Sequence, residues 1–408
     1  MHILIVSQYF WPENFKINDL AEELVRRGHR VTVLTGKPNY PSGEVLEDFR
    51  KDPAHYAFLN GVEIVRIPML ARGRGSLRLA LNYACFAASA CLFGPWKLRK
   101  VRVDAIFVFQ VSPGTVGVPA VLLKYLKRTR LVLWIQDLWP ETLDAIGITK
   151  GGLPVWLIGE MMSFIYKNCD LVLAQSRSFV PLVQGRTDKP ESVVYFPGWA
   201  DPPSGAAVDR APEIALRPDT FTIMFAGNVG VAQDLPAVLR AAAIVKQNRP
   251  DIRWIIVGDG RMFDFVEAEV ARLDLGGQVT LAGRFPPERM TSFYRHADAL
   301  LVSLQDKPIF AMTIPSKVQS YLQSGIPILC MVGGETAEIV TRSGAGLAVS
   351  PGDSDGLARA VTAMADLSEN DRKAMGEQGK AYAAREFDRG NLIARLEGYF
   401  KRLTGQPS

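Results

Sequence analysis

The chain has 408 residues, of which 48% are hydrophobic and 22% are charged, a composition typical of a soluble protein with more than one domain. Its four cysteines form no C-x-x-C pair, and none of its four histidines lies within four residues of another. These spacings exclude a zinc ribbon, a redox pair and a helical metal pair.

Residues 1–10 are expected to form a strand. They lack the basic start and the longer apolar core of a signal peptide. We therefore expect the chain to stay in the cytoplasm. A helix over 18–27, closed by Gly28, separates the first two of six predicted strands. Alternation of strands and helices predicts a parallel, doubly wound sheet. The six strands are at 3–7, 30–35, 63–67, 105–109, 131–135 and 171–174.

The segment 79–96 carries no charge over 18 residues, which is nearly long enough to span a bilayer. It is rich in Ala, Cys and Ser, and it contains Asn82, Gly94 and Pro95, whereas a spanning helix is normally richer in Leu and Ile. We expect a helix buried in the first domain. A membrane-surface helix with basic flanks and a true span remain open.

Residues 66–130 hold twelve basic residues and one acid, Asp104. Such a surface suits an anionic membrane, a phosphate-bearing substrate or nucleic acid. The region lacks interleaved aromatic and basic residues, so we expect no nucleic-acid binding.

Residues 197–220 are rich in Pro, Ala and Gly and show no sustained period, as expected of a linker between domains. A second series of strands follows, at 222–226, 254–257, 279–282, 299–303, 328–331 and 347–349. Two α/β domains in tandem leave a cleft, and ligands of open α/β sheets bind beyond the carboxyl ends of the strands.

One such strand end carries Gln136 and Asp137, directly after the apolar run 131–135. There Asp137 would orient a ligand, with Trp134 or Trp139 as a wall. The other interpretation is that Asp137 caps a helix beginning at Pro140. The two roles are compatible.

Three strand ends of the second domain carry glycines, a pattern typical of a nucleotide crevice: Gly227, Asn228 and Gly230; Gly258, Asp259 and Gly260; and Gly283 with Arg284. The alternative is that each is a tight turn, with Asp259 as a solvated helix cap. A helix predicted over 316–323 would direct free N–H groups at the same crevice. Lys307 and Lys317 are the cations placed to meet a diphosphate, unless both are only solvated.

The order of these motifs resembles that of the family 4 retaining glycosyltransferases. The motifs are "RGHRVTVLT", "QDLWPE", "FAGNVG", "VGDG", "DALLVSL" and "PSKVQSYLQSGIPI". Within the family, the chain is most similar to bacterial surface-polysaccharide transferases such as N-acetyl-L-fucosamine transferases.

The resemblance implies a GT-B fold, in which two Rossmann-like doubly wound parallel-sheet domains face a cleft. Residues 1–198, with a crossover helix in 387–408, would bind the acceptor, and 199–386 the nucleotide-sugar. It implies no metal and no cofactor besides a UDP-sugar donor.

Carried over to this sequence, the resemblance makes Asp137 and Lys317 catalytic. Lys317, with Arg284 as second choice, would stabilise the leaving diphosphate. The acceptor-side residues would be Glu13, Asn14, Lys16 and Gln136. The donor-binding residues would be Gly227, Asn228, Gly230, Gly258, Asp259, Gly260, Arg284, Lys307, Ser316, Gln319 and Ser320.

The sequence departs from the family pattern at three places. The first loop, 12–16, lacks the family's Gly-Gly pair, and Gln136 stands where many members have His. The family's spaced pair of glutamates is replaced by Met312 and Ser320, so that ribose binding would pass to Ser320 or Gln319.

We therefore expect a glycosyltransferase that uses a UDP-sugar, an N-acetylhexosamine or a deoxy relative, and a lipid-linked saccharide acceptor. It would act in bacterial surface polysaccharide synthesis, peripheral at the inner face of the plasma membrane. The alternatives are a UDP-sugar 2-epimerase and a sugar-nucleotide-binding scaffold without catalysis.

Overall fold

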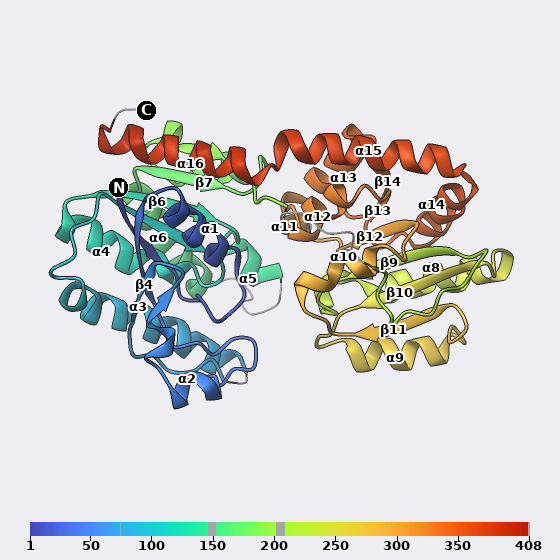
Figure 1. Cartoon of the computed structure of the whole chain (residues 1–408), viewed down its shortest axis with the longest axis horizontal. Helices are drawn as coiled ribbons and strands as arrows, with labels where there is room; N and C mark the ends of the chain where they lie inside the picture. The colour runs from blue at the N-terminus through green and yellow to red at the C-terminus, as the bar shows by residue number, and fades with distance from the viewer. Residues whose placement is uncertain (74, 146–151, 201–208, 407–408) are drawn as a thin grey trace. The chain divides into compact units, whose positions relative to one another are not determined.

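The computed structural model describes residues 1–73, 75–145, 152–200 and 209–406 (Figure 1). The chain divides into two compact units, unit 1 with Met1–Phe196 and Ile393–Ser408, and unit 2 with Pro197–Leu392. The observed division after residue 196 is two residues before the expected one, and the return to unit 1 is six residues later than expected. The assignment of acceptor to one unit and donor to the other stays a prediction.

In the described part of unit 1, eight strands form one sheet in the order β3-β4-β2-β1-β5-β6-β7-β8. All neighbours pair in parallel except β3 and β4. The six predicted strands are confirmed. The two-residue β3 and three-residue β8 were not predicted because they are too short to show a period. The bounds are β1 His2–Val6, β2 Arg30–Thr35, β3 Phe58–Leu59, β4 Val62–Arg66, β5 Ala105–Gln110, β6 Arg130–Ile135, β7 Leu171–Ala174 and β8 Val193–Tyr195.

The α-helices of unit 1 cover its sheet. Contacts of α4 with both α3 and α6 place these three side by side. The Glu397 carboxylate of α16 accepts a hydrogen bond from Arg27 Nη1 (2.7 Å) and forms another with His29 Nε2 (2.7 Å). These contacts fix α16 beside the end of α1. The bounds are α1 Lys16–Arg26, α2 Glu47–Lys51, α3 Ser76–Lys97, α4 Gly117–Lys127, α5 Glu141–Ala145, α6 Leu153–Asn168, α7 Phe179–Gln184 and α16 Arg389–Thr404.

Helix α3 contains the uncharged segment. By length and composition alone it is long and apolar enough to cross a membrane, and 28% of its most apolar stretch is buried. The buried side chains form one stripe, and the rest of the helix is at least partly exposed. The expectation of a buried helix therefore holds only for this stripe, because α3 packs against unit 1 on a single side. The stripe consists of Asn82, Tyr83, Phe86, Ala90 and Gly94.

In the described part of unit 2, six parallel strands follow the order β11-β10-β9-β12-β13-β14, and the predicted strands are confirmed. Of the expected linker 197–220, residues 201–208 lie outside the described residues, and the remainder forms neither helix nor strand. The strands are β9 Phe221–Ala226, β10 Ile252–Val257, β11 Val279–Gly283, β12 Ala299–Ser303, β13 Ile328–Met331 and β14 Gly346–Val349. The α-helices are α8 Leu235–Asn248, α9 Phe263–Arg272, α10 Met290–Tyr294, α11 Pro308–Met312, α12 Ser316–Ser324, α13 Gly334–Arg342, α14 Ser354–Asp366 and α15 Glu369–Glu386.

The strand order of each sheet reverses next to its first strand. In unit 1 the reversal lies between β1 and β5, and in unit 2 it lies between β9 and β12. The loops that follow the two strands at such a point lead away from each other. They leave a crevice for a ligand at the carboxyl ends of these strands. The predicted site residues follow strands at or beside these two points.

Candidate functional site

The loops after β9 and β10 pack backbone against backbone. The amide of Gly227 donates to the carbonyl of Val257 (2.9 Å), and that of Gly258 to Gly283 (2.7 Å). A Cβ atom on Gly258 would lie 1.8 Å from the carbonyl oxygen of Gly227, so only glycine fits there. Glycine at these positions leaves the backbone N–H groups of the loops uncovered by side chains, as a ligand that binds backbone requires.

The same loops bring Asn228 and Asp259 together. The amide of Val229 donates to the carbonyl of Asp259 (2.9 Å), and a Cβ on Gly260 would lie 2.7 Å from Asn228 Oδ1. The Asp259 carboxylate accepts from the amide of Gly260 (2.7 Å). Because α9 begins only at Phe263, Asp259 shapes its own turn instead of capping the helix.

Lys317 lies in the first turn of α12 and reaches this glycine cluster. Its Nζ is 3.7 Å from the ring centroid of Phe225, and a Cβ on Gly227 would lie 3.0 Å from it. Part of the Lys317 side chain is exposed, but Nζ is enclosed and has no hydrogen-bond partner among the described residues. Burial lowers the pKa of Lys317 to about 7. An enclosed ammonium without a counter-ion suits an anionic ligand.

Helix α12 is held in place by its own polar side chains. The Tyr321 hydroxyl accepts from the amide of Ala226 (2.9 Å) at the end of β9. The buried Gln319 amide nitrogen donates to the carbonyls of Ser316 (2.7 Å) and Pro315 (3.2 Å). With Gln319 engaged in its own helix, the partly exposed Ser320 is the better placed of the two for a ribose hydroxyl.

The remaining predicted donor residues are more exposed. Gly230 joins the glycine cluster, since a Cβ there would lie 2.5 Å from Asn228 Nδ2. Ser316, Arg284 and Lys307 are exposed, the last two after β11 and β12. No hydrogen bond or ion pair within the described residues fixes the side chain of Arg284 or Lys307, and the donor-binding role of both stays a prediction.

In unit 1, the Asp137 carboxylate links two strand-end loops. Its Oδ2 accepts from both the amide (2.9 Å) and the hydroxyl (2.8 Å) of Ser112, which follows β5. The carboxyl group is enclosed although part of the residue is exposed. Burial raises its pKa, and the two bonds from Ser112 oppose that rise. The helix-cap alternative is not needed, because Ser112 rather than α5 engages this carboxylate.

The two tryptophans beside Asp137 differ in position. Trp134 is fully buried and donates from Nε1 to the carbonyl of Phe196 (3.0 Å), so its expected role as a ligand wall is wrong. Both faces of β6 are covered, since all of its residues after Arg130 are buried, so a side chain on either face lies in the core. Trp139 donates from Nε1 to Ser112 Oγ (3.1 Å) and thereby supports the Asp137–Ser112 link.

Several glutamine side chains at this edge have one amide atom without a hydrogen-bond partner among the described residues. Gln8 Oε1, Gln110 Oε1 and Gln136 Nε2 are buried without a hydrogen bond among the described residues. Buried polar atoms are normally paired, so unpaired ones clustered at strand ends indicate a ligand or water site. The sequence prediction included Gln136 but missed Gln8, Gln110 and Ser112. The sequence feature that could have revealed these three residues is that each is polar and lies at the end of strand β1 or β5, or just after it.

Glu13 has a structural role within unit 1. Its Oε1 accepts from the amides of Asn39 and Tyr40 (both 2.7 Å), and Oε2 accepts from Phe10 (3.3 Å). Burial raises the pKa of the Glu13 carboxyl group to about 7, although these hydrogen bonds act to lower it. Asn14 beside it is exposed, and Lys16 begins α1. Glu13 thus ties together the loops after β1 and β2, where the sequence prediction had placed an acceptor.

The twelve basic residues of 66–130 do not form one surface. Arg66 and Arg72 lie at the carboxyl edge of the unit 1 sheet, where Arg66 donates to the carbonyl of Gly36 (2.8 Å). Arg78 lies at the start of α3, and Arg74 lies outside the described residues. The other eight precede β5 or β6, at the opposite, amino edge: Lys97, Arg99, Lys100, Arg102, Lys124, Lys127, Arg128 and Arg130.

No group of three or more His, Cys, Asp or Glu side chains positioned to hold a metal occurs in the described ranges. Lys317 brings a positive charge to the glycine cluster of unit 2, where a Cβ on Gly227 would lie 3.0 Å from its Nζ. Metal independence itself stays a prediction.

Comparison with known proteins identifies two family matches. The family described as glycosyl transferase 4-like domain matches residues 15–199, and that described as glycosyl transferases group 1 matches residues 209–382. The first match ends three residues beyond the amino-terminal part of unit 1, and the second lies within unit 2.

Among relatives, the probable glycosyltransferase WbjE of Pseudomonas aeruginosa is 27% identical over 68% of this chain and 70% of its own length. The putative colanic acid biosynthesis glycosyl transferase WcaI of Escherichia coli (strain K12) is 29% identical over 64% of this chain and 66% of its own. The chain thus aligns with about two thirds of each relative. A closer similarity to N-acetyl-L-fucosamine transferases stays a prediction.

Solved structures match almost the whole chain. The Anabaena HepE complex with UDP has a TM-score of 0.69 at 15% identity and covers 99% of this chain and 100% of its own. Sucrose-phosphate synthase from Thermosynechococcus elongatus has a TM-score of 0.71 at 15% identity and covers 99% of both chains. These similarities confirm the GT-B fold class. The two family matches together cover both domains: the amino-terminal domain is of the glycosyl transferase 4-like kind, and the carboxyl-terminal domain is of the glycosyl transferases group 1 kind.

Proposed function

We propose that this glycosyltransferase moves a sugar from a UDP-sugar to a lipid-linked saccharide acceptor with retention of configuration. The sugar is an N-acetylhexosamine or a deoxy relative, and the product is part of a bacterial surface polysaccharide. The observation that carries the proposal is the enclosed, unpartnered ammonium of Lys317 beside the glycine loops of β9 and β10. The UDP bound in the HepE structure supports a uridine nucleotide as the donor.

In this reaction the bond from the sugar C1 to the diphosphate breaks, and a bond from C1 to the acceptor oxygen forms. The acceptor proton leaves to the diphosphate or to solvent. Charge develops on the departing diphosphate, so a cation in a water-poor site stabilises the transition state. Lys317 supplies this charge, and the N–H groups at the start of α12 add to it. The same charge makes a metal unnecessary.

Asp137 is proposed to orient the acceptor hydroxyl or the transferred sugar. The hydrogen bonds from Ser112 hold the Asp137 carboxylate in one geometry, and both of them are accepted by Oδ2. A fixed carboxylate with a free oxygen is suited to positioning, which is the main protein contribution when the donor dissociates readily.

The two alternatives differ in their support. The matched families are transferases, which does not favour the 2-epimerase. A binding scaffold is favoured by one observation, the replacement of the acidic pair by Met312 and Ser320. Turnover decides between the scaffold and the transferase.

Peripheral attachment to an anionic membrane is part of the proposal. Of eighteen exposed large hydrophobic side chains among the described residues, eleven lie on the adjoining helices α3, α4 and α6. We call this set the helical face. Cations at the amino edge border it and match anionic lipid. The face consists of Leu77, Leu81, Leu92, Trp96, Leu122, Tyr125, Leu126, Leu153, Trp156, Leu157 and Phe164.

The buried ammonium leads to a pH prediction. Because the pKa of Lys317 is lowered to about 7, the free enzyme loses this proton above pH 7, and UDP must bind together with a proton. UDP affinity is therefore expected to fall about tenfold per pH unit above 7. Calorimetry in buffers of different ionisation enthalpy measures the proton uptake directly.

Lys317→Met is expected to weaken UDP binding by roughly 1.5–3 kcal/mol and to abolish the proton uptake. It should also raise the Tm of the UDP-free protein, since a buried unpaired charge disappears. Lys307→Ala is the matched control, because this lysine side chain is exposed and no hydrogen bond or ion pair fixes it among the described residues. Unchanged UDP affinity in Lys317→Met removes this residue from the site.

Asp137→Asn keeps the side-chain size and an oxygen that can accept from Ser112, so the Tm should barely move. Turnover should fall by about tenfold or more, equivalent to about 1.4 kcal/mol at the transition state, with UDP affinity near wild type. Thermal melting, steady-state rates and UDP titration test this. Full activity combined with a Tm several degrees lower would make Asp137 a purely structural link to Ser112.

Turnover with a panel of UDP-sugars, with and without an undecaprenyl-diphosphate-linked saccharide, tests the reaction itself. A transferase releases UDP at full rate only with the acceptor, retains activity in EDTA and gives a product with the anomeric configuration of the donor by NMR. Interconversion of UDP-sugars without acceptor indicates an epimerase. UDP-sugar binding without turnover of any donor indicates a scaffold.

Flotation with liposomes tests membrane attachment. Binding should require anionic lipid and weaken with salt, because surface attraction is screened beyond about 10 Å at 0.1 M. The double variant Leu92→Gln, Trp156→Gln should bind at least about tenfold more weakly, since burying each large apolar side chain contributes roughly 1.5 kcal/mol or more. The control Leu216→Gln, Phe265→Gln changes equally exposed side chains of unit 2. Equal losses in both variants would contradict a specific helical face.

A further inference from the structure

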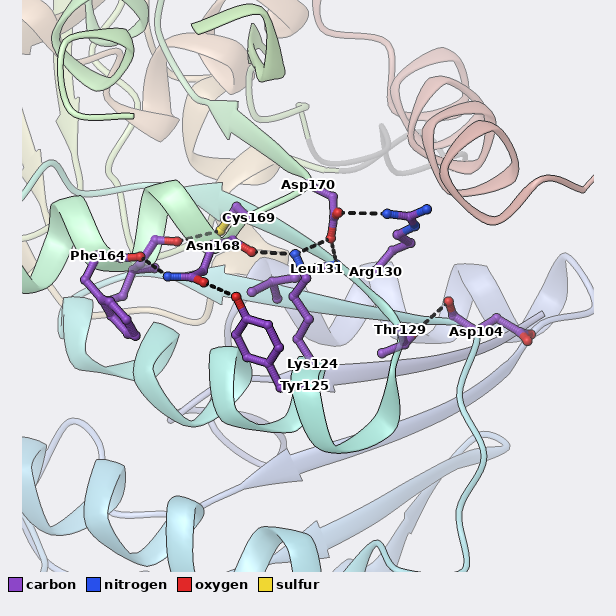
Figure 2. Close-up of polar contacts among 11 residues, drawn as sticks. Asp104, Lys124, Tyr125, Thr129, Arg130, Leu131, Phe164, Asn168, Cys169 and Asp170 are labelled. Carbon is purple, nitrogen blue, oxygen red and sulfur yellow. Dashed lines mark hydrogen bonds and ion pairs between the residues drawn. The ribbon is translucent and has the colours of Figure 1, made fainter. Parts of the chain in front are cut away.

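A cavity of about 770 Å³ opens in unit 1 at the amino edge of the sheet, opposite the edge that carries Asp137. We call it the amino-edge hollow. Its walls come from the residues before β5, from the end of α4 and the start of β6, and from the end of α16. Figure 2 shows the wall formed by α4 and β6 with the ends of α6 and of the loop before β5.

The hollow is rich in cations. Lys124, Arg128, Arg130 and Arg402 line it, against the single acid Asp104. The Asp104 carboxylate already accepts from the backbone amide of His2 (2.7 Å).

Asp170, at the start of β7, fixes two of these cations. It pairs with Lys124 (2.8 Å) and Arg130 (3.2 Å) and accepts from the amide of Leu131 (2.8 Å) (Figure 2). Burial opposes ionisation of Asp170, but these contacts outweigh it and lower its pKa. Four cations against the two carboxylates of Asp104 and Asp170 leave an excess of two positive charges.

The wall is also preorganised. Lys124 Nζ donates to the carbonyl of Asn168 (2.7 Å), and the Tyr125 hydroxyl donates to the Asn168 side chain. Asn168 in turn donates to the carbonyl of Phe164 (2.8 Å) (Figure 2). A cation held by its neighbours loses less side-chain entropy when it binds an anion.

The contacts of Arg128 within the described residues do not explain why an arginine occupies this position. It ends α4 in the left-handed conformation, with φ 52° and ψ 47°, where glycine is the favoured residue. Its guanidinium has no hydrogen bond or ion pair among the described residues. Cations near helix ends offset the helix dipole, but a lysine or arginine one turn earlier, such as Lys124, already does so.

We propose that the amino-edge hollow binds a phosphate-bearing group. Guanidinium groups pair with phosphate through two parallel hydrogen bonds, and Arg128, Arg130 and Arg402 supply three such groups. Tyr125, which lines the hollow, is 61% exposed and belongs to the helical face, as does the next residue, Leu126, which is 56% exposed. A cationic hollow beside an apolar face fits the boundary of a membrane, so the phosphate is that of an anionic phospholipid headgroup. The choice of a lipid headgroup rests on the membrane attachment in the proposed function, whereas the hollow itself does not depend on the transfer reaction.

The test uses the full-length double variant Arg128→Gly, Arg402→Gln. Glycine suits the backbone of residue 128, so the Tm should stay equal or rise while the cations are lost. Arg359→Gln, Lys373→Gln removes the same charge from unit 2 and is the matched control. With UDP saturating the donor site, binding is measured to vesicles of phosphatidylcholine and phosphatidylglycerol by co-sedimentation, and to inorganic pyrophosphate by calorimetry.

Binding to the anionic vesicles should fall about thirtyfold in the double variant, as expected for two cations near an anionic surface, and far less in the control. Pyrophosphate binding that survives saturating UDP and disappears only in the double variant would support the hollow with a soluble phosphate as its source. If the double variant and the control behave alike in both measurements, the cations serve only the helix ends and the proposal is overturned. Turnover is a separate readout, so failure of the proposed function leaves this result interpretable.

Discussion

The common direction of the strands organises the chemistry of this protein. All strand pairs in the two sheets are parallel except β3 with β4, so each sheet has a carboxyl edge and an amino edge with different neighbours. Helices return the chain between strands, which places helix starts at the carboxyl edge and helix ends at the amino edge. Lys317 and Asp137 lie at carboxyl edges, whereas most cations of 66–130 lie at an amino edge.

At the carboxyl edges, the protein holds polar groups in states that cost stability. The Lys317 ammonium is enclosed over Phe225, and three glutamine side chains carry buried unpaired atoms. Such groups are tolerated where a ligand completes them. The tight contact of Gly227 with Gly258 brings the two strand-end loops together, which only glycine at residue 258 permits.

At the amino edge, the charges are arranged for a surface rather than for a reaction. Asp170 fixes Lys124 and Arg130, and the exposed helices α3, α4 and α6 adjoin the same region. In the proposed function, attachment and transfer would use opposite edges of unit 1. The affinity for a membrane could then change without disturbing the residues around Asp137.

The sequence by itself determined the strands, the parallel architecture and the glycine loops, because period-2 and period-3.6 patterns and tight turns are local properties. It also led to the proposals of Asp137, from its place after a strand, and of Lys317, from its place at the start of a predicted helix. Only the tertiary structure decided that Trp134 belongs to the core, that Glu13 binds the amides of Asn39 and Tyr40, and that one stripe of α3 is buried. These outcomes, like the division of the basic region between two edges, depend on which segments meet in space, and sequence patterns carry no such information.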